Sequence, residues 1–218
     1  MARPLLHRLS SGQRQELVDH MLAYINDDVV DAHVHINHSG SDLLQGHRDY
    51  IQELEGYLRA NGASAFVPLP KWDPATAIPS EFNVVKPTDG GTELPPLEDL
   101  NPSLPLPRTF SSPSVCSFPS AAVLGNSLNG WHGEVHVQIG GTMGDARIAS
   151  AAPIFWCWHA FIDDVYATWQ ACPSRSRGLD DLPMTKDVFD PSKLPSGKVS
   201  RKLFKEWADW GKENLRLE

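Results

Sequence analysis

Proline is distributed very unevenly along this chain, and its distribution limits what the chain can fold into. Twelve of the 18 prolines fall between Pro68 and Pro119. Because proline fixes φ and has no backbone N–H, this stretch can form neither a long helix nor the interior of a sheet. It also contains Trp72, Phe82 and Phe110, which are unusual in disordered linkers. We therefore expect an ordered, irregular connector that wraps over a core formed by the rest of the chain.

The segments on both sides of this connector have helical periodicity. The first predicted helix starts with a capping box formed by Ser10 and Gln13. The predicted helices cover residues 10–25, 27–35, 43–60, 122–139, 153–171 and 198–215. The sequence thus predicts a mainly α fold with a four-helix-bundle core. We expect a single domain over residues 1–218, with its core at about 9–172 and a C-terminal extension at 175–218 that carries the last helix.

Composition excludes several classes of protein. The net charge of −8 disfavours nucleic acids and anionic membranes as partners. No apolar run approaches the roughly 18 residues of a membrane span. The first residues contain no apolar signal-peptide core, so a cytoplasmic location is expected. Three cysteines without a C-x-x-C spacing are too few for a disulfide scaffold.

Histidine is the residue in excess, with nine in 218 residues. His7 and His20 are interpreted as ordinary surface residues. The other seven form two groups, which are His33, His35, His38 and His47, and His132, His136 and His159. One histidine pair at helical spacing is weak evidence for a metal site, and a single buried histidine is more often packed than ligating. The recurrence of the groups makes the metal interpretation stronger.

The second group has the geometry of a metal triad. His132 and His136 are four residues apart, so both rings lie on one face of a helix and can reach one ion. His159, on the next helix, can supply a third imidazole. Asp163 lies one helical turn further and is expected to orient a ligand or a neighbouring group. The first group can form a matching triad, which suggests two metal ions facing each other in a bundle.

Ligation by imidazole alone suits copper, zinc, iron or nickel. A different interpretation starts from the H-x-H pair formed by His33 and His35, which resembles the metal-binding strand of amidohydrolases. Those enzymes need a (β/α)8 barrel of about 250 residues, and no alternating strand–helix pattern follows the pair. This alternative is therefore disfavoured.

With the two groups in view, the chain resembles the family of tyrosinases, catechol oxidases and haemocyanins, which hold a binuclear copper centre. The second copper motif of that family is matched by HGEVHVQIGGTMGDARIASAAPIFWCWHAFIDDVYATWQ. Weaker matches are GHRDYIQELEGYL around His47 and LPKWDPATAIPSEF in the connector. The resemblance covers about residues 9–172. It is highly specific at the second copper motif and less so at the first.

The resemblance implies two copper ions and a set of six ligands. These ligands are His33, His38, His47, His132, His136 and His159, with His35 as an alternative to His33. It also implies that Asp163, Phe155 and Gly133 line or support the site. The C-terminal lid domain of many family members is not expected in this chain.

The chain departs from the family pattern at several positions around the site. Trp158 replaces the first residue of a His-His pair, Gly46 replaces a Trp, and Ala152 replaces an Asp. Gly133 stands where many tyrosinases have an Asn that helps to deprotonate monophenols. Hydroxylation of monophenols is therefore in doubt.

The function that the resemblance implies is oxidation of o-diphenols or o-aminophenols by dioxygen to quinones or quinone imines. The alternatives are a tailoring oxidase for one specialised metabolite, a non-catalytic oxygen-binding protein with the same copper pair, and a relic with degraded metal sites. The expected partners are a small phenolic substrate and dioxygen, with no nucleic acid and no membrane.

Overall fold

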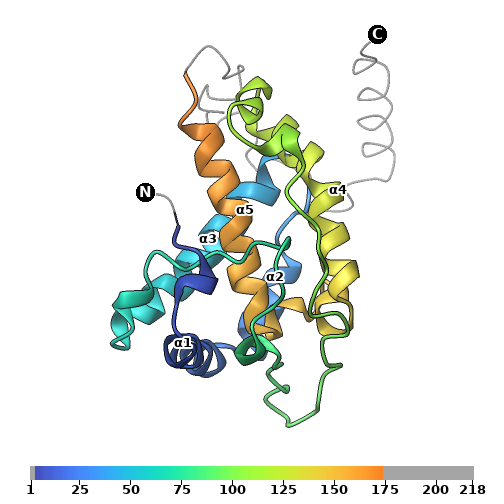
Figure 1. Ribbon diagram of the computed structural model, residues 1–218. Coiled ribbons are helices and arrows are strands. Elements are labelled where there is room, and N and C mark those ends of the chain that lie inside the picture. Colours follow the sequence, from blue (N-terminus) through green and yellow to red (C-terminus); the bar gives the residue numbers. More distant parts are fainter. Residues whose placement is uncertain (1–2, 174–218) are drawn as a thin grey trace, which may run out of the picture. The chain divides into compact units, whose positions relative to one another are not determined.

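The computed structural model describes residues 3–173, and its helices flank the proline-rich connector (Figure 1). The α-helices of this part are α1 (Ser11–Tyr24), α2 (Asp27–Val34), α3 (Gly40–Ala60), α4 (Ala121–Ile139) and α5 (Pro153–Gln170). Residues 3–173 contain no β-strand beyond an isolated bridge between Leu5 and Lys71. The mainly α fold is confirmed. The helix predicted over 198–215 and the extension at 175–218 lie outside the described residues.

The helix boundaries follow local capping signals, with one exception. Ser10 and Gln13 form the expected capping box at the start of α1. The exception is α3, which begins at Gly40 and not at Leu43 as predicted. Gly40 has a φ of +58°, and its N–H donates to Oδ1 of Asn126 on α4 at 2.7 Å. That acceptor lies far away in the sequence, so the local pattern could not show where α3 begins.

Helix α3 is the central element of the core and packs against both α4 and α5. In Figure 1, α5 (orange) runs through the middle of the drawing beside α4 (yellow). The two backbones of α3 and α4 touch at Gly125, where an added Cβ would lie 1.8 Å from the carbonyl oxygen of Gly40. A side chain at Gly125 would therefore push α4 away from the helix that carries His47.

The connector is ordered and irregular, as predicted. The Trp72 side chain is 2% exposed and that of Phe82 is fully buried, so the aromatic residues of the connector belong to the core. Its backbone forms hydrogen bonds with α5 and α4. The Trp72 N–H donates to the carbonyl of Cys157 in α5 at 2.9 Å, and the Glu98 N–H donates to the carbonyl of Ile139 at 3.0 Å.

A disulfide bond joins Cys116 of the connector to Cys172, just beyond α5, while Cys157 is a buried free thiol. The sequence did not predict this bond, because two cysteines 56 residues apart carry no recognisable spacing. A disulfide that closes a loop of that size typically stabilises the folded state by about 2–4 kcal/mol. Disulfides are typical of oxidising compartments, and the cytoplasmic location expected from the sequence stays a prediction. No helix of residues 3–173 is long and apolar enough to cross a membrane.

Candidate metal centre

Six histidines from four helices and one loop meet in a single buried cluster. Five of them have side chains with at most 9% of their surface exposed, and the sixth, His38, is half-buried. They come from α2 (His33), the loop before α3 (His38), α3 (His47), α4 (His132 and His136) and α5 (His159). These are the six histidines that the resemblance implies as ligands. His35 is exposed at the end of α2, and His7 and His20 also lie outside the cluster.

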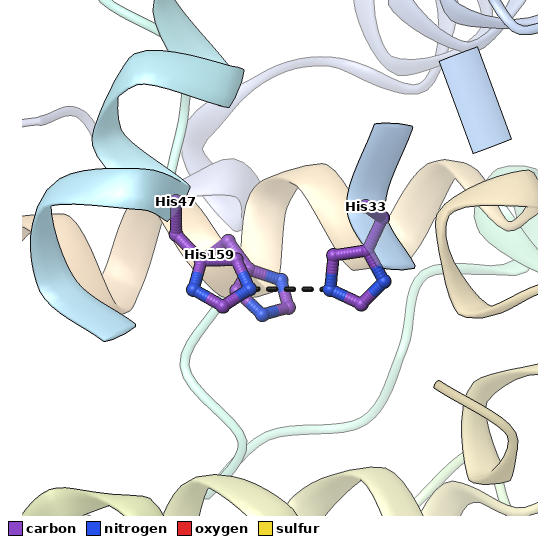
Figure 2. A group of neighbouring side chains, drawn as sticks. All are labelled: His33, His47 and His159. Atoms are coloured by element: carbon purple, nitrogen blue, oxygen red, sulfur yellow. Dashed lines mark hydrogen bonds between the residues drawn. The ribbon is translucent and has the colours of Figure 1, made fainter. Parts of the chain in front are cut away.

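The nitrogens of the cluster fall into two overlapping groups. Ring nitrogens of His33, His47 and His159 lie within 4.8 Å of one another (Figure 2). Those of His132, His136 and His159 do so as well. His159 belongs to both groups, and its ring stacks on His47 at 4.2 Å between centroids. The two expected triads therefore form one continuous arrangement with His159 in the middle.

Backbone carbonyls fix the orientation of five of the six rings. In each of these, Nδ1 lies within hydrogen-bond distance of a carbonyl oxygen, which leaves Nε2 as the unprotonated nitrogen. The pairs are His33 with Ala146 (2.8 Å), His38 with Ile36 (2.8 Å), His47 with Leu43 (2.7 Å), His136 with Met143 (2.9 Å) and His159 with Phe155 (2.8 Å). Metal-binding histidines are commonly held in this way, with the second ring nitrogen donating to a carbonyl.

The spacing of the Nε2 atoms fits shared metal ions. Nε2 of His33 lies 3.2 Å from that of His47 and 3.1 Å from that of His38. Two nitrogens bound to one ion at about 2.0–2.1 Å lie about 2.9–3.4 Å apart for square to tetrahedral bond angles. Since these Nε2 atoms carry no proton when Nδ1 donates, the contact brings lone pairs together, and a cation between them would relieve it. The residues present thus fit a binuclear, nitrogen-ligated centre.

Burial keeps the cluster neutral. It lowers the pKa of His33 and of His136 from 6.5 to about 4. Burial also lowers the pKa of His47, His132 and His159, well below the ordinary value. Neutral imidazole is the form that binds metal, so these rings are ready to act as ligands at neutral pH.

Phe155 lies against the histidine cluster, whereas a role for Gly133 at the site stays a prediction. The Phe155 ring is 4.0 Å from that of His159 and 4.7 Å from that of His33, between centroids, so it forms an apolar wall of the cluster. Gly133 follows His132, and a Cβ added there would meet no atom within 4 Å. The cluster is thus walled by an aromatic ring on one side.

Asp163 is held by two arginines, and its role in orienting a ligand stays a prediction. Its carboxylate accepts from Nε of Arg3 at 2.8 Å and pairs with Arg48. Arg3 also bonds Oε1 of Glu55 at 2.6 Å. A turn of helix separates Asp163 from His159, and the two arginines at that level take both carboxylate oxygens. Asp163 therefore fastens the N-terminal segment to α3 and α5.

The short loop between His33 and His38 explains the departure at Gly46. A Cβ added at Gly46 would lie 2.8 Å from Cγ2 of Ile36. Ile36 of this loop thus occupies the space beside His47, and glycine is the residue that leaves room for it. The sequence showed the short loop and the missing Trp as separate departures, whereas the structure joins them.

Sequence reasoning missed the backbone groups that hold the rings. The carbonyl of Met143 is presented to His136 by a tight turn that starts at Gly140 and Gly141, both with positive φ. A Cβ at Gly141 would lie 1.7 Å from the carbonyl oxygen of Pro96, so the connector presses on this turn. The Gly-Gly pair was the visible signal, but its contact with the connector depends on the tertiary fold.

The chain is similar to tyrosinases. Residues 101–172 match the family model described as the common central domain of tyrosinase. A tyrosinase of Streptomyces glaucescens is 28% identical over 226 residues, which cover 83% of this chain and 80% of that protein. A tyrosinase of Streptomyces lincolnensis is 27% identical over 180 residues, 61% of this chain and 64% of that protein. A tyrosinase of Streptomyces antibioticus is 42% identical over 50 residues, 21% of this chain and 18% of that protein.

Proposed function

Because the chain is similar to tyrosinases over most of its length, we propose that it is a binuclear copper oxidase of that family, which uses dioxygen to oxidise o-diphenols or o-aminophenols. The products are quinones or quinone imines. The observation that carries this proposal is the convergence of six neutral histidines, five of them with Nδ1 held by a backbone carbonyl. Nitrogen ligation of this kind favours copper over zinc.

Each of two copper ions would be held by the Nε2 atoms of three histidines. One ion would be bound by His33, His38 and His47. The other would be bound by His132, His136 and His159. Placement within the cluster favours His33 over His35 as the ligand from α2, since His35 is exposed.

The copper pair supplies the exchange of electrons between dioxygen and the phenolic substrate. Two o-diphenols each lose two electrons and two protons, and one dioxygen takes up four of each to give two water molecules. The chain itself keeps the ligands neutral through burial and fixes their tautomers through carbonyls. Phe155 keeps water from one side of the cluster.

The partial exposure of one proposed ligand favours an oxidase over an oxygen carrier. His38 is half-buried, so a ring-shaped substrate can approach the cluster from its side. A carrier must exclude such molecules. Glycine at position 133 provides no side chain to assist a monophenol, so we propose that monophenols are poorer substrates than o-diphenols. A tailoring oxidase for one specialised metabolite is the second candidate, since Val34 and Val137, which follow His33 and His136 in the sequence, are exposed.

The test is oxygen uptake by the copper-loaded full chain with a panel of catechol, o-aminophenol and a monophenol such as tyrosine. We expect uptake with catechol and o-aminophenol that exceeds the rate with the monophenol by at least about tenfold. Reversible oxygen binding without catechol turnover would contradict the proposal and favour a carrier. Failure to retain copper after loading would favour a relic.

A further inference from the structure

His132 differs from the other five histidines in its surroundings. Its Nδ1 is buried and has no hydrogen-bond partner within the described residues. Each of the other five rings has a carbonyl at this position. The triad of His33, His38 and His47 is thus fully anchored, whereas the triad that includes His132 is not.

The tryptophans near His132 offer it no hydrogen-bond acceptor. The Trp158 ring lies nearly parallel to that of His132, at 6.2 Å and 11°, and Trp131 packs edge-on against Trp158 at 5.1 Å. The indole nitrogens of both tryptophans are donors without a partner in the part of the chain that the structure describes. A proton on Nδ1 of His132 would therefore be a buried donor with nothing to receive it.

His132 has another way to place its proton. Its Nε2 lies 2.9 Å from Nε2 of His159, and His159 uses its own proton on Nδ1 for the carbonyl of Phe155. The Nε2 of His159 is therefore an acceptor. In the metal-free protein, His132 can keep its proton on Nε2 and donate it to His159. This bond occupies the two nitrogens that a metal ion would need.

The other triad has no such alternative. Nε2 of His33 faces Nε2 of His38 at 3.1 Å and Nε2 of His47 at 3.2 Å. All three rings already donate from Nδ1, so a proton can move to Nε2 only if a carbonyl bond is broken. A metal ion is the partner that satisfies all three nitrogens with their rings in place.

We infer that the two metal positions fill in a fixed order, first the position of His33, His38 and His47, and then the position completed by His132. The inference rests on the ligand set proposed above. Entry of the second ion must displace the bond between His132 and His159 and move the His132 proton to Nδ1. Loss of a hydrogen-bond partner behind a ligating histidine typically weakens metal binding about 10–100-fold. We expect a separation of that size between the two dissociation constants.

The first test is a stepwise titration of the metal-free full chain with cobalt(II), followed by its visible absorption. The wild-type protein should bind two ions in two resolved steps, the second about 10–100-fold weaker. The variants His38→Ala and His136→Ala form a matched pair, since each removes one ligand from a different triad. His136→Ala should keep the tight step and lose the weak one, and His38→Ala should lose the tight step. Two ions bound with equal affinity in the wild type, or loss of the tight step in His136→Ala, would overturn the inference.

The second test needs neither a variant nor a metal. Nitrogen-15 NMR of the metal-free protein distinguishes protonated from bare ring nitrogens at each histidine. We expect the proton of His132 on Nε2 and those of His33, His47 and His136 on Nδ1. A proton on Nδ1 of His132 would overturn the inference. Neither test measures diphenol oxidation. The filling order can therefore be wrong while the proposed function holds, and the proposed function can be wrong while the filling order holds.

Discussion

The two histidine triads differ in the kind of information that defines them. The triad of α4 and α5 has the stronger sequence motif, and the family match over residues 101–172 covers all of it. The triad of α2 and α3 lies outside that match and departs from the family in its short loop. In the structure, however, the weaker motif has the complete set of carbonyl anchors, and the stronger motif leaves His132 without one.

This difference shows that a ligand motif and a preorganised site are separate properties. The motif gives the residue types and their helical spacing. Preorganisation depends on backbone groups brought from elsewhere, such as the carbonyl of Ala146 for His33. A change in the protein or its conditions can therefore affect one triad, the other, or both alike.

The largest effect is expected from His33 compared with its neighbour His35. His33→Ala removes a buried ligand with an Nε2 atom in the cluster, whereas His35→Ala changes an exposed side chain. We expect His33→Ala to retain at most one copper ion per chain and to lose diphenol oxidation. His35→Ala should retain two ions and wild-type rates. Copper content by elemental analysis, together with oxygen uptake, checks both. The reverse pattern would show that His35 is the ligand.

Acid should destabilise the metal-free protein through both triads alike. The pKa of His33 and of His136 falls from 6.5 in the unfolded chain to about 4 in the fold, so each ring is neutral when buried and takes up a proton on unfolding. This contribution is fully present above pH 6.5 and is lost as the pH falls towards 4. It amounts to about 3 kcal/mol for each histidine. Urea unfolding from pH 7 to pH 4 measures it, and a stability that is constant over this range would contradict the buried, neutral cluster.

Of the two triads, only the second should be affected by a methyl group at Gly141. Gly141 has a φ of +54°, and a Cβ would lie 1.7 Å from the carbonyl oxygen of Pro96. Gly141→Ala should lower the free energy of unfolding by about 3 kcal/mol. It should also weaken the second cobalt step, because the turn presents Met143 to His136, and leave the first step unchanged. Gly130→Ala, on open α4 surface, is the control and should be neutral or stabilising. An equal effect of the two variants would refute this account of the turn.

The smallest effect is expected at the loop of the first triad. Gly46→Ala places a methyl group 2.8 Å from Cγ2 of Ile36 and should destabilise the fold by about 2 kcal/mol. Adding Ile36→Ala should reverse part of this loss of stability, because it removes Cγ2 of Ile36, the atom that the new methyl group would contact. Gly56→Ala, in the same helix with no neighbour within 4 Å, is the control. Thermal unfolding of the wild type, Gly46→Ala, Ile36→Ala and the double variant forms a double-mutant cycle. Strictly additive effects would show that Ile36 does not fill this space.

Much of the fold was predictable from the sequence, because local signals define it. The capping box at Ser10 and the apolar stripes gave the helices, and the prolines gave the connector. The start of α3 and the bond between Cys116 and Cys172 were not predictable, since both depend on residues far apart in the chain.

Spacing and resemblance predicted the six histidines of the cluster, but they did not predict how the six rings lie relative to one another. The sequence treats His159 as a member of one triad, whereas its ring stacks on His47 of the other. The bonds of Asp163 to Arg3 and Arg48 were also missed, because an N-terminal residue that folds back onto α5 leaves no local pattern.

The most direct test of the central claim is anomalous diffraction at the copper edge from crystals of the copper-loaded full chain. The account predicts two copper peaks inside the cluster. One should lie within about 2.0–2.1 Å of Nε2 of His33, His38 and His47. The other should lie at that distance from Nε2 of His132, His136 and His159. A single peak, or a peak bound by His35 in place of His33, would contradict it.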